Sequence, residues 1–317
     1  MTKRRPRVSV ILKRTSWRKW VEEERDLRVE ALLEAGDETV RRMRPGHDDH
    51  LASVDEVRRA LAELNADVTW CERPQSFKVD ARCELVVTVG GDGTLLAASH
   101  GIGANTPLLG VNSSPAHSVG FFCAARKGQV RAALGAALDG GLRRTELTRM
   151  RVVLNGRSLH ERVLNEILFC HASPAATSRY ILRLAEGDRV PAIEEQKSSG
   201  LWVGPAAGST AAQKSAGGKI LPLASRKLQY VVREPYQMIG QELSMALGLV
   251  DEDQTLQIRS KMRQARLFLD GDHIVHEIGI GDVVTLQRSD EPLVVLGLSR
   301  NGDARKGGRT GATASRG

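Results

Sequence analysis

Three glycines enclose one aspartate directly after a strand-like run. The run covers 85–89, and the turn that follows reads Gly90-Gly91-Asp92-Gly93-Thr94 before a helix-forming segment begins. Glycines let a ligand come close to the main chain, and the unpaired N–H groups at the start of the next helix would face an anion. A carboxylate in such a turn has a use if it holds Mg²⁺ or accepts a proton from an attacking hydroxyl. The turn therefore predicts the phosphoryl-transfer site of a kinase.

The alternative is a turn that only binds a nucleotide, or that only reverses the chain. The glycines follow the pattern GGxG, so the GxGxxG pattern of dinucleotide-dependent dehydrogenases is absent. The GxxxxGK[ST] pattern of P-loop proteins is absent as well. A plain turn has no use for the aspartate, and this favours the kinase.

Strand-like and helical segments alternate from residue 8 to about 145. Such alternation predicts a doubly wound parallel sheet, whose ligands bind at the carboxyl ends of the strands, where Asp92 and Asn112 fall. We expect strands at 8–12, 67–70, 85–89 and 107–112, a helical stretch from 17 to about 44 that Pro45-Gly46 ends, and helices at about 54–64 and 129–138. Asp48, Asp49 and His50 are expected in a solvated loop.

The pattern of expected secondary structure changes from about residue 146, where strand-like runs follow one another with few helical patterns. Asn155-Gly156 and Asp270-Gly271 have the composition of hairpin turns. The second half therefore predicts a mainly antiparallel β domain, and the fold class is α/β plus β. The expected strands lie at 149–154, 162–170, 180–184, 201–203, 228–232, 256–258 and 266–269.

Two segments of this half do not behave as plain β structure. Asn165 and Glu166 interrupt an apolar strand, and both side chains are costly to bury without partners. Side by side, they could hold the paired hydroxyls of a ribose and the edge of a base; an edge strand with a solvated glutamate is the alternative. Small and hydroxyl-bearing residues are dense at 205–211 and 215–218, which would let a ligand approach the main chain, although a flexible linker would have the same composition.

Charge, hydropathy and cysteine usage narrow the class of protein. The net charge is +8, but residues 1–7 and 300–317 each carry +4, so the remainder is neutral and a nucleic-acid-binding face is not indicated. No apolar run approaches the roughly 20 residues that span a bilayer. Four scattered cysteines without a CxxC pair favour reduced thiols and a cytoplasmic protein.

The motifs together resemble the NAD kinases. The glycine turn, Gly110-Val111-Asn112, Leu164-Asn165-Glu166, Gly208-Ser209-Thr210-Ala211 and Leu269-Asp270-Gly271 occur in that family's order and rough spacing, over about residues 80–280. The resemblance implies an α/β domain at 1–145, a β-sandwich that binds NAD at 146–285, and a segment at 286–300 that returns to the first domain. We expect the basic tail at 301–317 to be disordered.

The resemblance also implies an activity and its residues. The activity is NADP biosynthesis, by phosphorylation of the adenosine 2′-hydroxyl of NAD with ATP, or polyphosphate, and a divalent metal such as Mg²⁺; family members usually form dimers or tetramers. Asp92 looks like the general base that takes the proton of the hydroxyl, and no metal ligand is assigned. Phosphate or nucleotide binding falls to Gly90, Gly91, Gly93, Thr94 and Asn112, and NAD binding to Asp92, Gly93, Asn165, Glu166, Lys197, Thr210, Ala211, Ala212, Gln213, Lys214 and Ser215.

Departures from the family pattern leave other readings open. The family commonly has Thr-Pro-Thr before Gly-Ser-Thr-Ala and a tyrosine after it, where this chain has Pro205-Ala206-Ala207 and Ala212. Ser199 stands where an acidic residue is common, and the long loop at 112–120 is similar to the mitochondrial branch. Lys197 is expected to supply a charge where other members use arginine. The alternatives are a related nucleotide or lipid kinase, or a nucleotide-binding protein without turnover.

Overall fold

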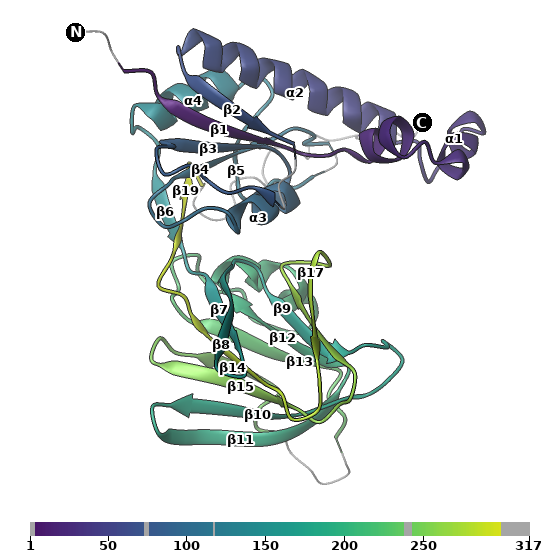
Figure 1. Cartoon of the computed structure of the whole chain (residues 1–317), viewed down its shortest axis with the longest axis vertical. Helices are drawn as coiled ribbons and strands as arrows, with labels where there is room; N and C mark the ends of the chain where they lie inside the picture. Colours follow the sequence, from purple (N-terminus) through teal and green to yellow (C-terminus); the bar gives the residue numbers. More distant parts are fainter. Residues whose placement is uncertain (1–3, 73–75, 117, 238–242, 299–317) are drawn as a thin grey trace, which may run out of the picture.

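A parallel sheet flanked by helices forms the first half of the chain, and two antiparallel sheets form the second (Figure 1). The computed structural model describes residues 4–72, 76–116, 118–237 and 243–298. This arrangement confirms the predicted α/β plus β fold class. The predicted basic tail at 301–317 lies outside the described residues.

The first sheet has the strand order β2-β1-β3-β4-β19-β6, with β5 paired to β4. All of its pairings are parallel except that of β19 with β6. The central strands are continuous runs of buried apolar residues, as expected for a sheet covered on both faces. The strands are β1 (Arg7–Leu12), β2 (Asp67–Cys71), β3 (Leu85–Gly90), β4 (Leu108–Asn112), β5 (Cys123–Arg126), β6 (Arg144–Leu147) and β19 (Leu293–Leu296).

Helices cover both faces of this sheet. Helices α2 (Met43–Glu63) and α4 (Val130–Leu138) share one core with β1, β3 and β4, and Val54, Val57 and Leu61 form the predicted buried face of α2. Helix α3 (Asp92–Ser99) lies on the opposite face, which is turned toward the antiparallel sheets (Figure 1). A short π-helical turn, η1 (Arg18–Glu23), and α1 (Leu27–Glu34) come before α2.

The expectation that Pro45-Gly46 ends a helix is wrong, because both residues lie in the first turn of α2. The N–H groups of a first turn have no intrahelical acceptor, so proline is tolerated there; the helix makes its bond from Gly46 N to Arg42 O at 3.1 Å. The expected solvated loop is therefore helical. Asp48 is exposed, but His50 is buried and its Nδ1 lies 3.1 Å from Ser113 Oγ.

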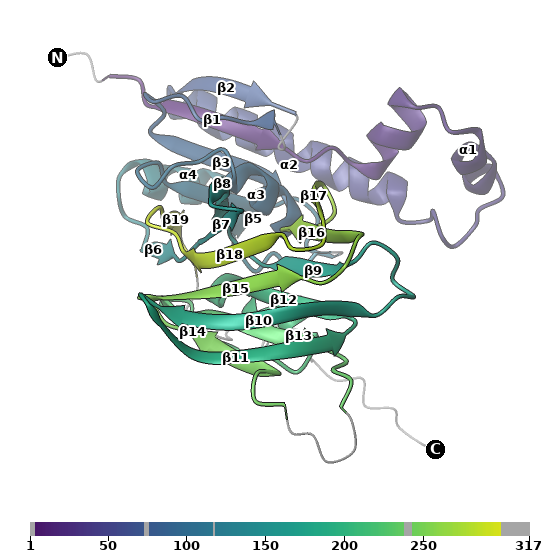
Figure 2. The same cartoon turned by 60° about the horizontal axis from the view of Figure 1, so that its bottom comes forward.

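The second half consists of two six-stranded sheets that pack face to face, as Figure 2 shows from below. Their orders are β11-β10-β15-β18-β7-β8 and β14-β13-β12-β9-β16-β17, and every pairing is antiparallel. The first contains β7 (Met150–Leu154), β8 (Arg157–Val163), β10 (Ser178–Glu186), β11 (Arg189–Ser198), β15 (Gln254–Ser260) and β18 (Val283–Arg288). The second contains β9 (Ile167–His171), β12 (Gly200–Pro205), β13 (Leu228–Arg233), β14 (Leu247–Val250), β16 (Ala265–Leu269) and β17 (Ile274–Ile278).

Two short helices and one returning strand complete the described chain. The 3₁₀ helix η3 (Ala206–Thr210) and α5 (Ala212–Ser215) directly follow β12. After β18, the chain crosses back and places β19 between β4 and β6 of the first sheet. Leu95 and Ala98 of α3 share a core with Leu164 and Ala207, so the two halves are joined by apolar packing. None of the helices within the described ranges is long and apolar enough to cross a membrane.

Candidate active site

The glycine turn links β3 to α3 at the carboxyl edge of the first sheet. Gly91 is the residue before the helix, and Asp92 is its first residue. A Cβ atom on Gly90 would lie 2.3 Å from Thr94 Oγ1, so a side chain at this position would displace Thr94. Gly93 is exposed, and a Cβ atom there would meet no atom within 4 Å. The structure therefore brings Gly90, Gly91, Asp92, Gly93 and Thr94 together at the start of an eight-residue helix.

Asp92 is held by the main chain of the segment that precedes β5. Its two carboxylate oxygens accept hydrogen bonds from Phe121 N and Phe122 N, both at 2.9 Å. Burial raises the pKa of the neighbouring Cys123 thiol to about 12, and the negative charge of Asp92 adds to this shift. The carboxylate is partly exposed and has lone pairs beyond the two that accept these bonds.

Asn112 ends β4 and uses its side chain to shape the following loop. Its Nδ2 donates to Ser118 O at 3.0 Å, and its Oδ1 accepts from Ser114 N at 3.1 Å. The residue is 6% exposed. Asn112 thus lies beside the glycine turn, as predicted from the strand ends, with its amide engaged by the protein; nucleotide binding by this residue stays a prediction.

The Leu164–Glu166 segment connects β8 to β9 and is organised by a distant carboxylate. Asp270, in the turn between β16 and β17, accepts hydrogen bonds from Leu164 N at 2.8 Å, Asn165 N at 2.7 Å and Glu166 N at 3.1 Å. The expected strand at 162–170 is therefore divided into two at the polar pair. Three donors to one carboxylate fix the backbone from which the Asn165 and Glu166 side chains extend.

Three buried polar atoms at predicted NAD-binding positions have no hydrogen-bond partner among the described residues: Asn165 Oδ1, Glu166 Oε2 and Gln213 Nε2. Burial raises the pKa of Glu166 to about 7, and the charge of Asp270 contributes to the shift. Unpartnered buried polar atoms are expensive, and a ligand that donates and accepts hydrogen bonds here would remove that cost.

The small residues at the end of β12 and directly after it allow η3 and α5 to pack against this segment. A Cβ atom on Gly208 would lie 1.9 Å from Asn165 O, and one on Gly204 would lie 2.1 Å from the same atom. The Cβ position of Gly204 is also 2.7 Å from Gln213 Nε2, so Gln213 lies beside Asn165 and Glu166. The other residues predicted here lie along the same turn, with Thr210, Lys214 and Ser215 exposed and Ala211 and Ala212 half-buried.

A hollow of about 290 Å³ opens beside Glu166 on the outer face of the second sheet. Trp202 and Phe268 line it, because their neighbours along β12 and β16 point into the core and these two point away. The other lining residues are Leu168, Gly271 and Asp272. Its aromatic walls would suit a flat ring. No pattern in the sequence indicated that Trp202 and Phe268 lie together. Alternation along a strand shows which residues point outward, but not which outward residues of different strands are neighbours.

Lys197 is not brought to this hollow. It lies in β11, the edge strand of the other sheet, where its carbonyl accepts a hydrogen bond from Tyr236 N at 2.8 Å. Its predicted role in NAD binding stays a prediction.

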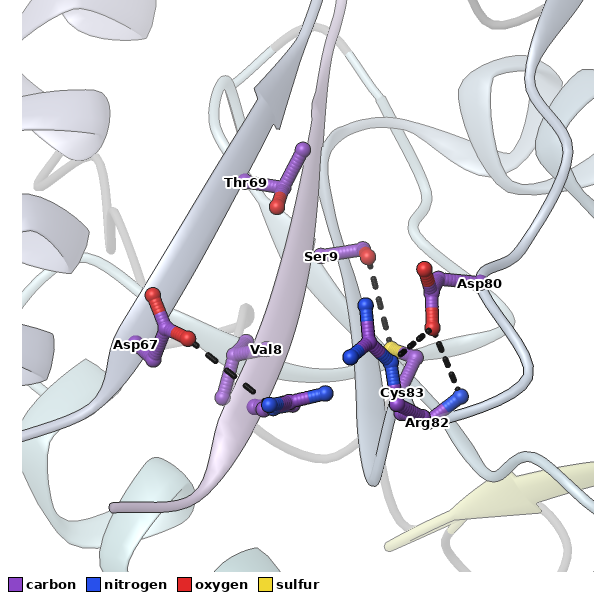
Figure 3. Close-up of a pocket in the computed structure, with 8 residues that line it drawn as sticks. Val8, Ser9, Asp67, Thr69, Asp80, Arg82 and Cys83 are labelled. Atoms are coloured by element: carbon purple, nitrogen blue, oxygen red, sulfur yellow. Dashed lines mark hydrogen bonds and ion pairs between the residues drawn. The ribbon is translucent and has the colours of Figure 1, made fainter.

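A second pocket, of about 160 Å³, lies at the opposite edge of the first sheet (Figure 3). It is at the amino ends of β1 and β2, near Ser9, and it is lined by ion-paired side chains: Arg7 lies 3.9 Å from Asp67, and Arg82 lies 3.4 Å from Asp80. Asp92 and Asn112 are at the other ends of their strands. This pocket does not contribute to the candidate site.

Comparison with known proteins identifies the family. A family model described as the ATP-NAD kinase N-terminal domain matches residues 3–141. A curated protein of rice (Oryza sativa subsp. japonica), named a probable NADH kinase, is 37% identical over 80% of this chain and 82% of its own length. This chain belongs to the NAD kinase family. The predicted family and the predicted enzyme class, a phosphotransferase with an alcohol acceptor, are confirmed.

Solved structures of NAD kinases have the same fold. An NAD kinase from Archaeoglobus fulgidus, determined in complex with ATP, matches with a TM-score of 0.63 at 18% identity and covers 92% of this chain and 94% of its own. Yeast NADH kinase in complex with NADH matches with a TM-score of 0.69 at 16% identity, over 94% of this chain and 85% of its own. The predicted architecture of an α/β domain followed by antiparallel sheets is thereby confirmed.

Proposed function

We propose that this NAD kinase transfers the terminal phosphoryl group of ATP to the adenosine 2′-hydroxyl of NAD or NADH. The observation that carries the proposal is the set of unpartnered buried atoms on Asn165, Glu166 and Gln213. They lie on the side of α3 that faces the second half of the chain, and the helix begins at Asp92. A dinucleotide has the hydroxyl and amide groups that such atoms require.

Asp92 is the proposed general base. A ribose hydroxyl is a weak nucleophile, so a carboxylate within hydrogen-bond reach accepts its proton as the oxygen attacks phosphorus. A new oxygen–phosphorus bond forms, the bond from the terminal phosphorus to its bridging oxygen breaks, and ADP leaves. The N–H groups from Phe121 and Phe122 keep the carboxylate in place while it gains the proton.

Glu166 and Asn165 are proposed to grip the nucleotide. The Glu166 carboxylate would accept hydrogen bonds from ribose hydroxyls, and the Asn165 amide oxygen would accept one from an N–H or O–H of the ligand. The hollow between Trp202 and Phe268 adjoins Glu166 and would receive a ring of the substrate. The segment from Thr210 to Ser215 would lie along the bound dinucleotide.

Mg²⁺ is proposed as the companion of ATP. Among the described residues, no group of three or more His, Cys, Asp or Glu side chains could hold a metal ion by itself. Mg²⁺ commonly keeps several waters and binds through one or two carboxylates together with substrate phosphates. The phosphates of ATP and water would therefore supply its ligands, and no described carboxylate is assigned to the ion, because Asp92 has the role of the base. When bound, Mg²⁺ would neutralise the charge of the phosphates.

Both redox forms of the substrate are supported by relatives. The rice relative is named a probable NADH kinase and the yeast structure contains NADH, while the A. fulgidus protein is named an NAD kinase. The structure from A. fulgidus contains ATP, which supports ATP as the phosphoryl donor here.

The test is product formation by the purified protein. ATP, Mg²⁺ and either NAD or NADH are supplied, and the product is separated and its phosphate located by ³¹P NMR. We expect NADP or NADPH with the phosphate on the adenosine 2′-oxygen. Absence of both products, also with polyphosphate as donor, would overturn the proposed function.

A homo-oligomer and a cytoplasmic location complete the proposal. A row of apolar side chains crosses the outer face of the second sheet in register: Leu247, Val231, Trp202, Leu168, Phe268 and Val275. The middle of the row, Trp202, Leu168 and Phe268, lines the hollow proposed for the substrate, and Val231 is buried. The interface is therefore proposed at the two ends of the row, where Leu247 and Val275 are each 38% exposed, because exposed apolar side chains commonly mark interfaces. Light scattering after size exclusion tests the proposed oligomer; a monomer at micromolar concentration would contradict it.

The four scattered cysteines, which form no CxxC pair, support the proposed cytoplasmic location, because they favour reduced thiols.

A further inference from the structure

Two histidines connect α3 to the segment that carries Asn165 and Glu166. His100 caps the carboxyl end of α3, and its Nε2 lies 3.2 Å from Asp270 Oδ2. Its Nδ1 lies 3.1 Å from Nε2 of His160 in β8. The Asp270 side chain is 1% exposed and the His100 side chain 13%, so the contact is largely shielded from water.

The hydrogen bonds that link Arg162 N, His160, His100 and Asp270 allow one consistent assignment of donors and acceptors. Arg162 N donates to His160 Nδ1 at 3.1 Å, so that nitrogen carries no proton. Neutral His160 then carries its proton on Nε2 and donates to His100 Nδ1. Neutral His100 in turn carries its proton on Nε2, beside the Asp270 carboxylate. Burial lowers the pKa of His160 to about 4, in agreement with a neutral ring.

The same end of α3 is fastened by two arginines from the second half. Arg149, a fully buried side chain, donates to Ser99 O at 3.1 Å and to Ile102 O at 2.9 Å. Arg162 donates to His100 O at 3.1 Å. Cations and donors at a helix carboxyl end satisfy carbonyls that have no intrahelical partner. Within the described ranges, these two side chains hold the helix without a hydrogen bond or ion pair to Asp270. His100, at the C-cap of α3, is the residue that reaches it.

We propose that His100 is a positioning residue, which fixes the Asn165–Glu166 segment relative to Asp92 by holding Asp270. The inference rests on the proposed function. Helix α3 has the predicted base at its first residue and His100 directly after its last, a separation of about 12 Å along the helix axis. Asp270 in turn holds three consecutive N–H groups of the nucleotide grip. The base and the grip therefore belong to one rigid unit through this contact, although they come from different halves of the chain.

The decisive comparison is between His100→Gln and His100→Asn. The glutamine amide nitrogen reaches the position of imidazole Nε2 and still donates to Asp270, whereas the shorter asparagine reaches only the position of Nδ1. Because a misplacement of about 1 Å can cost about 100-fold in rate, we expect His100→Asn to lower kcat/KM for NAD about 10- to 100-fold. His100→Gln should stay within about threefold of the wild type.

The readout must separate positioning from a general loss of structure. We expect His100→Asn to raise KM for NAD and lower kcat while KM for ATP changes less than about twofold. His171→Gln is the matched control, because among the described residues the His171 ring hydrogen-bonds only to Ser173 of the neighbouring turn; it should leave all constants unchanged. Equal effects of Gln and Asn at position 100, or parallel changes in both KM values, would overturn the proposal.

A measurement without substrate distinguishes failure of this inference from failure of the proposed function. Long-range ¹⁵N NMR of histidine-labelled protein reports the tautomer of each ring, and the difference from His100→Gln assigns His100. We expect both His100 and His160 to be neutral with the proton on Nε2 at pH 7.5. A proton on Nδ1 of either ring would overturn the hydrogen-bond chain, whatever the enzyme phosphorylates.

Discussion

The glycine turn and the Asn165–Glu166 segment hold their polar groups in opposite ways. At the turn, Asp92 and Asn112 are each held by two hydrogen bonds to backbone groups of the loop between β4 and β5. At the segment, the backbone is fixed by Asp270, but the side chains of Asn165 and Glu166 keep buried oxygens that have no partner in the described part of the chain. The first region is organised by the protein alone, while the second is completed by what binds there.

This difference has an energetic meaning. A backbone-held carboxylate is placed before the substrate arrives, which is what preorganised catalysis requires. An unpartnered buried polar atom costs about 1–3 kcal/mol, and a ligand that pairs with it recovers that cost as affinity. Changes at the turn should therefore affect turnover, and changes at the segment should affect binding and stability.

Asp92→Asn should produce the largest effect. The amide cannot accept the proton of the hydroxyl, so kcat should fall about 10²- to 10⁴-fold while KM for NAD changes only a few-fold. One of the two N–H groups from Phe121 and Phe122 also loses its acceptor, and the melting temperature should fall slightly. Steady-state kinetics measures this, with Asp139→Asn at the exposed end of α4 as the control. Retention of kcat would show that another group is the base.

Glu166→Gln should separate stability from binding. The folded-state pKa of about 7 exceeds the usual value of 4.5, so the folded wild type binds the extra proton and its stability falls as the pH rises from about 4.5 to 7. At pH 8 the loss is on the order of 3 kcal/mol. The variant should therefore unfold at higher urea than the wild type at pH 8, the two should converge near pH 4.5, and NAD affinity should fall. A variant less stable than the wild type at pH 8 would contradict the raised pKa.

Gly208→Ala tests the close approach of η3 to Asn165. The added Cβ atom would lie 1.9 Å from a backbone oxygen, which cannot rotate away. We expect a loss of about 1–3 kcal/mol in unfolding free energy and a weaker affinity for NAD. Gly46→Ala is the matched control, since its Cβ atom would meet nothing within 4 Å in α2, and it should be neutral or stabilising. Equal behaviour of the two variants in urea unfolding would contradict this packing.

His50→Gln should have the smallest effect, and only in acid. Burial, helped by the charge of Lys13, lowers the pKa of His50 to about 4. The unfolded chain therefore binds more protons between about pH 6.5 and 4, and the stability of the wild type falls as the pH is lowered. At pH 5.5 this loss is about 1 kcal/mol. At pH 5.5 the variant should therefore gain most of this free energy of unfolding relative to the wild type, compared with the difference between the two proteins at pH 8. The same difference at both pH values would show that His50 is accessible to protons.

How far the sequence could predict these regions depends on the separation of the interacting residues. The β3–turn–α3 unit is local, and its apolar run and glycines define it within a few residues. The role of Asp270 could not be derived from local pattern, because the N–H groups that donate hydrogen bonds to its carboxylate lie about a hundred residues earlier. The family resemblance marked the residue, but not what it holds.

The errors have the same physical origin. A proline such as Pro45 indicates the end of a helix unless it lies within the first turn. Where α2 begins is set by its packing against the sheet, which the local sequence does not show. His50 is buried because α2 continues past it to contact Ser113, which follows β4. The pairing of Trp202 with Phe268 depends on the order of strands in the second sheet, which no local pattern contains.

The most direct test of the account is proton release on binding of NAD. Calorimetric titrations at pH 7 in buffers of different ionisation enthalpy report the protons released. Hydrogen bonds from ribose hydroxyls should lower the pKa of Glu166 from about 7, so binding should release up to roughly half a proton in the wild type and none in Glu166→Gln. Tight binding of NAD with no difference in proton release between the two proteins would contradict the claim that the ligand completes this site.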